Sequence, residues 1–281
     1  MRESCDLGLS GVSQTLLVPL AARALARRLF PAAGFADVAA ERAMETLGIE
    51  PTSVISDPLS ILGFIIRSRL LDRLTKRFLA EHENAVVLDL GAGFSTAFER
   101  CGASDATWIE VDLPAVTELH RRVVPADARR RRIAASLETT DWLVALELPD
   151  APTLVIAEGV LPYLSRPAIV SLFRALADRL CGRTSVLLYD TFSFLMVGTA
   201  RYHPAIGRLT RKDPTIEFRS GVRTRADFIW GEPRWHLDEI HDVLAQQPPP
   251  VALWSGIVDA TFGVPLYCVV QLHLDAPAPG E

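Results

Sequence analysis

Two glycines in residues 89–96 (Asp-Leu-Gly-Ala-Gly-Phe-Ser-Thr) stand directly after a short apolar run. Glycine has no Cβ, so Gly91 and Gly93, with Ala92 between them, allow a tight turn and let a ligand approach the backbone. A dinucleotide fingerprint would need a third glycine where Thr96 stands, and the Gly-Lys-Ser/Thr of a triphosphate loop is absent from the sequence. The turn therefore predicts either a ligand without a pyrophosphate or a glycine pair required only for packing.

Two acidic residues end the next apolar run, in residues 108–114 (Trp-Ile-Glu-Val-Asp-Leu-Pro). Glu110 lies 19 residues and Asp112 lies 21 residues after Gly91, near the spacing of about 20 at which an acid binds an adenosine ribose. Strand alternation places both acids on one face, where one of them can equally be a solvated charge. The turn and the acids together favour an adenosine ligand without a pyrophosphate, which describes S-adenosylmethionine.

Helices are expected in the first eighty residues, where apolar side chains recur at three- and four-residue spacing. The expected helices run from Leu17 to a stop at Pro31, over 36–47, and from Asp57 to about residue 80. Asp57 is a suitable N-cap because its side chain can accept a hydrogen bond from the first-turn backbone, and the proline that follows suits that turn.

From residue 85 onward, short apolar runs alternate with helical stretches. The expected strands are 85–90, 107–111, 132–135, 153–157, 185–189, 251–255 and 266–274, with helices that include 114–123 and 166–180. Continuous apolar strands in such an alternation predict a doubly wound, Rossmann-like α/β sheet that is covered by helices on both faces.

A single domain of 281 residues is expected, in three parts. Residues 1–83 form a helical cap, residues 84–191 and 251–274 form the sheet with its helices, and residues 192–250 form an insertion. The insertion lacks the alternation, is rich in Arg, Trp and Pro, and is too long for a plain connection. Segments of this kind are usually lids or binding elements.

Composition and charge are ordinary for a soluble globular protein, with 49% apolar and 22% charged residues. The formal net charge is 29 − 34 = −5, which disfavours nucleic acid and anionic membranes as partners. The longest uncharged run, residues 7–22, is interrupted by polar residues and Pro, unlike a membrane span, and the first six residues lack the apolar core of a signal peptide. The one basic run, Arg129–Arg132, is interpreted as a solvated helix end or loop.

The cysteines lie at least 80 residues apart, which fits neither a disulfide framework nor a zinc site and favours a reducing, cytoplasmic location. They are Cys5, Cys101, Cys181 and Cys268. His236 and His241 are five residues apart, the wrong spacing for one helix face, so no metal site is expected.

Four strings make the sequence resemble the leucine carboxyl methyltransferase family, and within it the bacterial polyketide O-methyltransferases of the tetracenomycin type. They are Gly91–Gly93, residues 108–114, Asp141-Trp142 and residues 157–164 (Ala-Glu-Gly-Val-Leu-Pro-Tyr-Leu). The resemblance covers most of the chain, from an opening helix at 11–25 to Trp230-Gly231. It implies a class I methyltransferase with a seven-stranded, mostly parallel sheet. It also implies S-adenosylmethionine as cofactor and methyl transfer to a carboxylate or hydroxyl of a small secondary metabolite, in that branch a polyketide.

The resemblance assigns cofactor contacts to residues of this sequence. It places Arg67 where the family holds the methionine carboxylate of the cofactor, which a guanidinium can grip with two parallel hydrogen bonds. Glu158, at the end of the fourth strand, would lie near the methionine end. Asp112, supported by Glu110 and followed by Leu113, would bind the ribose. The plain alternative for Arg67 is a solvated helix arginine, such as the nearby Arg69.

Two departures from the family pattern concern the adenine and the glycine turn. Ser136-Leu137 stands where the family commonly has Asp-Leu, whose acid accepts a hydrogen bond from the adenine amino group. Ser136 can still accept such a bond, and Leu137 can pack on the adenine face or in the core. Ser95 stands where the turn usually continues with Asp, so a polar contact below the turn is expected to be weaker.

The acceptor decides whether a base is needed. A carboxylic acid, with an ordinary pKa of about 4, is already ionised at neutral pH, whereas a phenol, with an ordinary pKa of about 10, needs a base or a lowered pKa. Tyr163 is a candidate to orient either acceptor, His203 a candidate base, Arg201 a carboxylate clamp and Trp230 a pocket residue. The plain alternative for Tyr163 is an aromatic side chain at an interface, and for His203 it is a histidine on the surface.

Two other functions stay open at this point: carboxyl methylation of a protein C-terminus, and cofactor binding without turnover. In the methyltransferase interpretation, the cap and the insertion should form the acceptor pocket and exclude water, because the loops of the sheet offer little apolar surface of their own.

Overall fold

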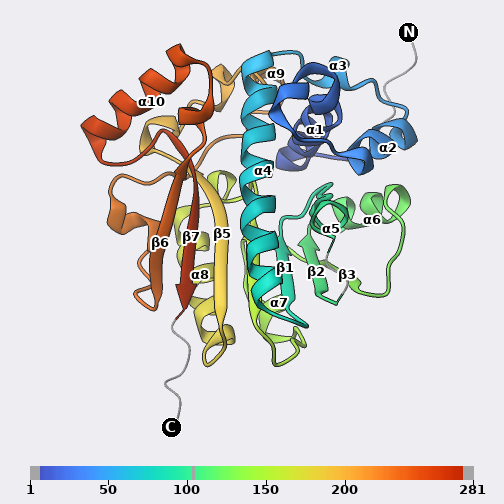
Figure 1. Cartoon of the computed structure of the whole chain (residues 1–281), viewed down its shortest axis with the longest axis vertical. Helices are drawn as coiled ribbons and strands as arrows, with labels where there is room; N and C mark the ends of the chain where they lie inside the picture. Colours follow the sequence, from blue (N-terminus) through green and yellow to red (C-terminus); the bar gives the residue numbers. More distant parts are fainter. Residues whose placement is uncertain (1–6, 103–104, 275–281) are drawn as a thin grey trace.

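Seven strands form one sheet in the order β3-β2-β1-β4-β5-β7-β6 (Figure 1). The computed structural model describes residues 7–102 and 105–274. The strands are β1 (Val86–Leu90), β2 (Thr107–Asp112), β3 (Arg130–Ala134), β4 (Thr153–Ala157), β5 (Ser185–Phe192), β6 (Trp235–Asp242) and β7 (Tyr267–Leu274). Neighbours from β3 to β5 pair in parallel, whereas β7 runs antiparallel to both β5 and β6. The predicted seven-stranded, mostly parallel, Rossmann-like sheet is confirmed.

The central strands are buried along their whole length because helices cover both of their faces. Every residue of β1 and β4 is buried. The chain moves from β1 to β2 and β3 on one side, and returns to β4 on the other side of β1. In such sheets the crevice at the carboxyl ends of the strands, where the order reverses, is the usual place for a ligand.

The helical cap begins with the short 3₁₀ helix η1 (Gly11–Leu16). Four α-helices follow: α1 (Leu17–Leu29), α2 (Val38–Leu47), α3 (Pro51–Val54) and α4 (Pro58–Glu81). The predicted cap of α4 is confirmed, since the Asp57 side chain accepts a hydrogen bond from the Ser60 backbone N–H at 2.7 Å. Asp37 caps α2 in the same way. Figure 1 shows α1–α3 beyond one end of the strands, while α4 runs along the sheet.

The remaining helices follow the strands. They are α5 (Ala97–Cys101), α6 (Pro114–Val123), α7 (Asp141–Val144), α8 (Arg166–Leu180), α9 (Gly207–Lys212) and α10 (Pro249–Phe262). The predicted bounds of α6 and α8 agree with the structure. No helix of the described residues is both long and apolar enough to cross a membrane. Cys101, Cys181 and Cys268 are free thiols, and Cys5 lies outside the described residues.

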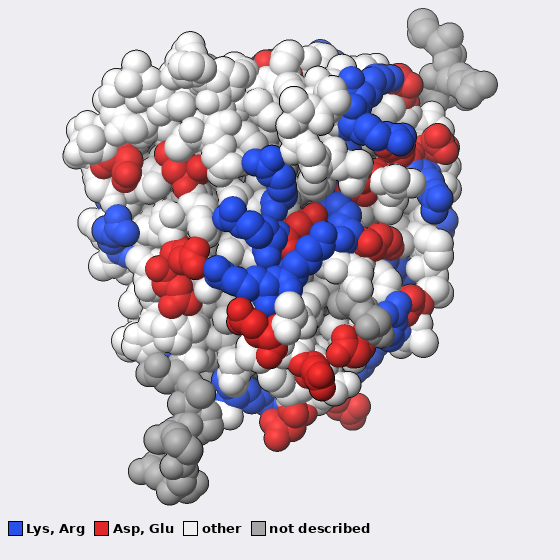
Figure 2. Space-filling model, in the orientation of Figure 1, with Lys and Arg blue, Asp and Glu red and all other residues white. Residues whose placement is uncertain are grey.

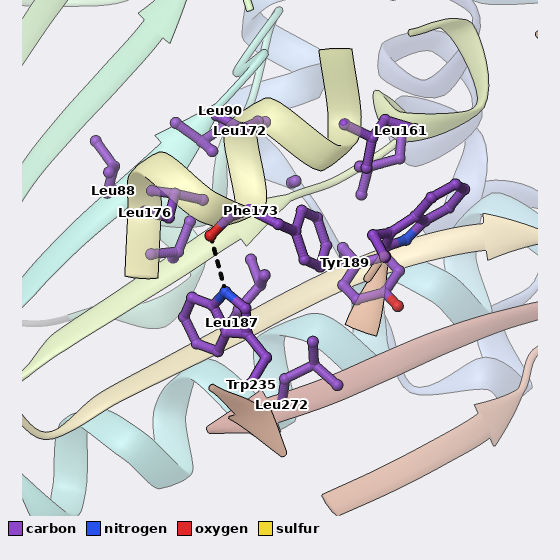
Figure 3. Close-up of a cluster of buried hydrophobic side chains, with 14 of the residues drawn as sticks. Leu88, Leu90, Leu161, Leu172, Phe173, Leu176, Leu187, Tyr189, Trp235 and Leu272 are labelled. Atoms are coloured by element: carbon purple, nitrogen blue, oxygen red, sulfur yellow. Dashed lines mark hydrogen bonds between the residues drawn. The ribbon is translucent and has the colours of Figure 1, made fainter. Parts of the chain in front are cut away.

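Three apolar clusters hold these layers together. One joins α8 to one face of the sheet, one joins α4 and α5 to the other face, and the third joins the cap helices to Phe94, to Leu119 of α6 and to residues that follow β5. Figure 3 shows the first, in which Phe173 of α8 packs against Tyr189 of β5 and the Trp235 indole N–H donates to the Phe173 carbonyl at 3.1 Å. Buried polar atoms need such partners, so the tryptophan orientation is fixed as well as its burial.

The strand expected at 251–255 is wrong, because these residues lie in α10. A short apolar run does not distinguish a buried strand from a helix, and the three prolines at 248–250 suit a helix start. The seventh strand is instead β6, within the range expected to be an insertion. Its alternating charged residues hid it, since it is an edge strand with much of one side exposed. The chain between β5 and β6 is therefore 193–234.

Candidate functional site

A cavity of about 600 Å³ lies at the carboxyl ends of β1, β2, β4 and β5. The glycine turn and the ends of the strands form one wall. The other walls come from η1, α1 and α4 of the cap and from the segment that follows β5. Most of the exposed lining is apolar. Eleven of the fourteen residues singled out from the sequence line it: Arg67, Gly91, Ala92, Gly93, Asp112, Leu113, Ser136, Leu137, Glu158, Tyr163 and His203.

The glycine turn is required by packing as well as by any ligand. Gly91 has a φ of 62° and Gly93 a φ of 53°, values that favour glycine. A Cβ on Gly91 would lie 2.3 Å from Cγ2 of Val160, so the loop after β4 can pack against the turn only if residue 91 is glycine. The opposite side of the turn faces the cavity. The packing interpretation of Gly91 is therefore confirmed, and its position in the cavity wall is compatible with the ligand interpretation.

Asp112 is joined to the glycine turn at the end of β2. Its Oδ2 accepts a hydrogen bond from the Gly93 N–H at 2.6 Å, and its Oδ1 accepts one from the Leu113 N–H at 2.6 Å. Burial raises the pKa of this carboxyl, against the effect of the two backbone donors. Each carboxylate oxygen can accept a further bond. The arrangement therefore suits a vicinal diol such as that of a ribose.

Arg67, halfway along α4, reaches across the cavity wall to the ends of three strands. Its Nε donates to Oε1 of Glu158 at 2.9 Å. Its Nη1 donates to Oδ2 of Asp190 at 3.2 Å and to the hydroxyl of Tyr267 at 2.9 Å. Burial opposes the charged form, but Tyr267 and the two carboxylates raise the pKa of Arg67 well above its ordinary value. We call these four residues the Arg67 cluster.

Arg67 was expected to bind a carboxylate through two parallel hydrogen bonds, but the structure leaves fewer donors for this. Nε and Nη1 already donate within the protein, so among the described residues only Nη2 makes no hydrogen bond and is left for a ligand. One cation faces two carboxylates, which gives the cluster a net charge of −1. Arg69 behaves as the solvated comparison should, because it is exposed. Figure 2 shows basic side chains gathered over the region of α4.

Among the lining residues that sequence reasoning missed are Arg23, Asp190 and Tyr267. Arg23, on the buried face of α1, donates from Nε to Asp37 at 3.0 Å and from Nη2 to the Phe94 carbonyl at 2.6 Å. The sequence feature that could have identified Arg23 was a charged residue within the apolar stripe of a helix. Asp190 had a similar signal, because it is a charged residue within a buried strand. Tyr267 had none, since its hydroxyl meets the cluster only through the β5–β7 pairing.

Asp89, the acid of β1, lies in the cavity wall, and no described residue forms a salt bridge with it. Burial, and then the nearby Glu110 carboxylate, raise its pKa to about 8. Its Oδ2 is buried and accepts no hydrogen bond from any described residue. A buried polar atom without a partner is costly, so this position favours a ligand or protonation.

Glu110 is a correction, because it does not line the main cavity. Its Oε1 accepts from Nε of Arg130 at 2.6 Å, and its Oε2 accepts from Nε of Arg132 at 3.1 Å. The β2–β3 register places Arg132 directly beside Glu110. The solvated interpretation of the basic run is accordingly wrong for Arg130, which is 7% exposed. His120 completes this Glu110 cluster, and burial lowers its pKa to about 2.

Trp230 and Arg201 are also corrections, since neither lines the cavity. Trp230 is fully buried beside Phe173, with ring centroids 6.4 Å apart, on the α8 side of the sheet. Arg201 is exposed, and its guanidinium lies over the ring of Tyr202 at 4.7 Å. Large aromatic residues fill cores more often than they mark sites, and the sequence did not show which side of the sheet Trp230 would face.

Aromatic side chains form a wall of the cavity that begins at Tyr267 of the Arg67 cluster. Ring centroids lie 4.6 Å apart for Phe192 and Tyr267, 4.7 Å for Phe192 and Phe218, and 5.6 Å for Tyr163 and Phe218. Phe218 also meets His203 edge-on at 5.9 Å. Phe192, Phe218 and His203 come from the segment that follows the body of β5, so the expected contribution of residues after 191 to the cavity is present.

Tyr163 and His203 both offer hydrogen-bond donors in this wall. Burial raises the pKa of Tyr163 to about 12, so its hydroxyl stays protonated. Burial lowers the pKa of His203, so the ring is neutral at pH 7. Its Nδ1 accepts a hydrogen bond from the Ala205 N–H at 3.2 Å, which places the ring proton on Nε2. In this arrangement Nε2 of His203 is a hydrogen-bond donor, which favours a role in binding an acceptor over the expected role of a base.

At the adenine position expected from the resemblance, Ser136 lines the cavity and its Oγ accepts from the Glu138 N–H at 3.2 Å. Leu137 is 7% exposed and belongs to the core as well as to the cavity wall. Among the described residues, no group of three or more His, Cys, Asp and Glu side chains could hold a metal ion.

The sequence is similar to curated methyltransferases. It is 38% identical over 157 residues to the tetracenomycin polyketide synthesis O-methyltransferase TcmP of Streptomyces glaucescens, covering 56% of this chain and 57% of that protein. It is 34% identical over 146 residues to a putative S-adenosyl-L-methionine-dependent methyltransferase of Mycobacterium ulcerans, covering 49% of this chain and 47% of that one. The matches thus span about half the length of these relatives.

A solved structure supports the fold. A DUF574 family protein from Streptomyces avermitilis superposes with a TM-score of 0.51 at 18% identity, over 90% of this chain and 97% of that one. The model of the leucine carboxyl methyltransferase family matches residues 14–177, which is more than half of the chain. These residues include the glycine turn, Arg67, Asp112 and Glu158. The protein belongs to the leucine carboxyl methyltransferase family.

Proposed function

We propose that the protein is an S-adenosylmethionine-dependent O-methyltransferase that methylates a carboxylate of a small secondary metabolite, with a polyketide as the metabolite class. The observation that carries the proposal is a single cavity with two chemically different ends. The glycine turn, Asp112 and the Arg67 cluster line one end, and an aromatic wall with two hydrogen-bond donors, which meets the cluster at Tyr267, lines the rest.

The residues at the first end fit the cofactor. Asp112 would accept hydrogen bonds from the ribose hydroxyls, and Leu137 would pack against the adenine. Nη2 of Arg67 would take the methionine carboxylate, and Glu158 the ammonium group. Bound S-adenosylmethionine supplies a methyl group already activated by the sulfonium charge, so the protein needs chiefly to orient the acceptor and exclude water. The cap and the segment 193–234 would exclude water from the cavity.

The acceptor end favours a carboxylate over a neutral phenol. The Tyr163 hydroxyl and the His203 Nε2–H would carry protons at neutral pH and could donate hydrogen bonds, so both suit an acceptor oxygen that already carries negative charge. A carboxylate is ionised at this pH without help, whereas a phenol would need a base that these two residues do not provide. The aromatic wall suits a flat ring system.

Two measurements test the proposal. Calorimetry should detect binding of S-adenosylhomocysteine and no binding of NAD, and no heat with S-adenosylhomocysteine would refute the cofactor assignment. Mass spectrometry with methyl-labelled S-adenosylmethionine should then find transfer to anthraquinone-2-carboxylate in preference to 2-hydroxyanthraquinone, a matched pair with the same ring system. Transfer to the hydroxyl alone would overturn the carboxylate assignment, and binding without transfer to any acceptor of a broad panel would favour a non-catalytic binder.

Carboxyl methylation of a protein C-terminus is the other candidate, since the family takes its name from that chemistry. A peptide panel ending in leucine tests it in the same labelling assay. The aromatic lining of the cavity favours the small acceptor, because a leucine side chain and its carboxylate would leave much of that wall without contact.

A further inference from the structure

Asp190 and Tyr267 lie in the cavity wall, where nothing assigns them a role. They come from neighbouring antiparallel strands, β5 and β7, in which Phe192 pairs with Tyr267 and Asp190 with Val269. The Tyr267 hydroxyl donates to Oδ2 of Asp190 at 2.7 Å and accepts from Nη1 of Arg67 at 2.9 Å. The other oxygen of Asp190 accepts from the Gly159 N–H at 2.5 Å. Both side chains thus contact groups that the proposed function uses.

These contacts fix the plane of the Arg67 guanidinium. Glu158 holds Nε, Asp190 and Tyr267 hold Nη1, and Phe64 lies 5.2 Å from the guanidinium carbon. Gly159 lies against the same group, since a Cβ there would stand 3.2 Å from Nη1 and 3.4 Å from Nη2. Because the guanidinium is planar and its Nε and Nη1 are both held by hydrogen bonds, the free Nη2 keeps one orientation. A donor held in place loses less entropy when a ligand binds it.

The charge of the cluster specifies which ligand group suits it. A simple carboxylate would meet one cation beside two carboxylates and would be repelled by the excess negative charge. An amino acid end group carries a carboxylate and an ammonium close together, so it can use Nη2 and a Glu158 oxygen at once. Ser68 also donates to Oε1 of Glu158 at 2.9 Å, which leaves Oε2 for such an ammonium.

We propose that Tyr267 and Asp190 are positioning residues that hold Arg67 for the amino acid end of the cofactor. This inference rests on the proposed function. Neither residue needs to touch the cofactor, because each acts through Nη1 of Arg67 and leaves Nη2 as the binding atom. The adenosine end, at Asp112 and the glycine turn, does not depend on them.

Two ligands separate this role from a general effect on the cavity. S-adenosylhomocysteine has both the adenosine and the amino acid end, whereas 5′-methylthioadenosine has the adenosine and thioether without the amino acid. Calorimetry of Tyr267→Phe should show about tenfold weaker binding of S-adenosylhomocysteine, the effect of one hydrogen bond to a charged group, and affinity for 5′-methylthioadenosine within about twofold of wild type. Tyr202→Phe, at an exposed tyrosine, is the matched control and should change neither affinity.

The outcomes distinguish the two hypotheses. If the wild-type protein binds neither ligand, the proposed function fails. If it binds both and Tyr267→Phe weakens neither, or weakens both equally, the positioning role is overturned while the proposed function stands. Asp190→Asn provides a second variant if Tyr267→Phe does not fold, as judged by its melting curve. It keeps the size of the side chain and the bond to Gly159, and should again weaken only S-adenosylhomocysteine.

Discussion

The Glu110 cluster and the Arg67 cluster are both buried ionic networks built on the same sheet, yet they differ in what they leave unsatisfied. In the Glu110 cluster, one carboxylate is shared by Arg130 and Arg132, both of its oxygens are occupied, and the donor left without a partner among the described residues, Nη2 of Arg132, is buried away from the main cavity. In the Arg67 cluster, one guanidinium is shared by two carboxylates, and its Nη2 remains available at a cavity. A buried ion pair therefore does not identify a site; an available donor at an open cavity does.

The largest effect is expected on the free energy of unfolding, and it tests whether the Glu110 cluster stabilises the fold. Glu110→Gln should lower the free energy of unfolding by about 3–5 kcal/mol, because it leaves two arginines buried beside a neutral amide. Urea denaturation measures this, with Glu118→Gln, at an exposed residue of α6, as the control that should change it by less than about 0.5 kcal/mol. A small effect at Glu110 would mean that its cluster contributes little to the stability of the fold.

Asp112 stands two residues further along the same strand and should behave in the opposite way. Asp112→Asn should weaken binding of both S-adenosylhomocysteine and 5′-methylthioadenosine by roughly ten- to a hundredfold, because a charged acceptor for the ribose is lost. Its unfolding free energy should change little, since Asn can still accept one of the two backbone bonds. Calorimetry and urea denaturation of the same preparation give both values, and unchanged affinities would remove Asp112 from the site.

Asp89 has no salt-bridge partner among the described residues, unlike the two clusters, and its effect on stability should therefore depend on pH. Its pKa of about 8 in the folded chain lies above the unfolded value near 4, so the folded state holds a proton that the unfolded state releases between these values. Its contribution to stability therefore falls as pH rises from about 4 to 8. Asp89→Asn should melt higher than wild type at pH 8, by about 2–4 °C for each kcal/mol gained, with the difference shrinking towards pH 4.5. A difference that does not vary with pH would contradict the raised pKa.

The smallest expected effect concerns His203. His203→Asn keeps an acceptor for the Ala205 N–H and removes the ring, so methyl transfer to a carboxylate acceptor should fall by less than about tenfold and stay flat between pH 6 and 8. Labelled-methyl turnover across that range is the measurement. A loss of a hundredfold or more, with a wild-type profile that rises through a pKa near 6.5, would restore His203 as a base.

Much of the fold followed from short-range signals, and the failures have physical causes. The glycine turn, β4, α6, α8 and the Asp57 cap depend on neighbouring residues, so their positions could be predicted. The run at 251–255 failed because a few apolar residues suit a helix and a strand equally, and β6 failed because an edge strand tolerates charges.

The sequence by itself determined the order of the strands from β1 to β5 and most of the functional candidates at their carboxyl ends, because both follow from local periodicity. Only the tertiary structure decided which of those residues face the cavity. Alternation places Glu110 and Asp112 on one face, but β3 covers the first with arginines while the cavity begins at the second. Asp190 and Tyr267 meet Arg67 from 123 and 200 residues away, and no local pattern encodes such a distance.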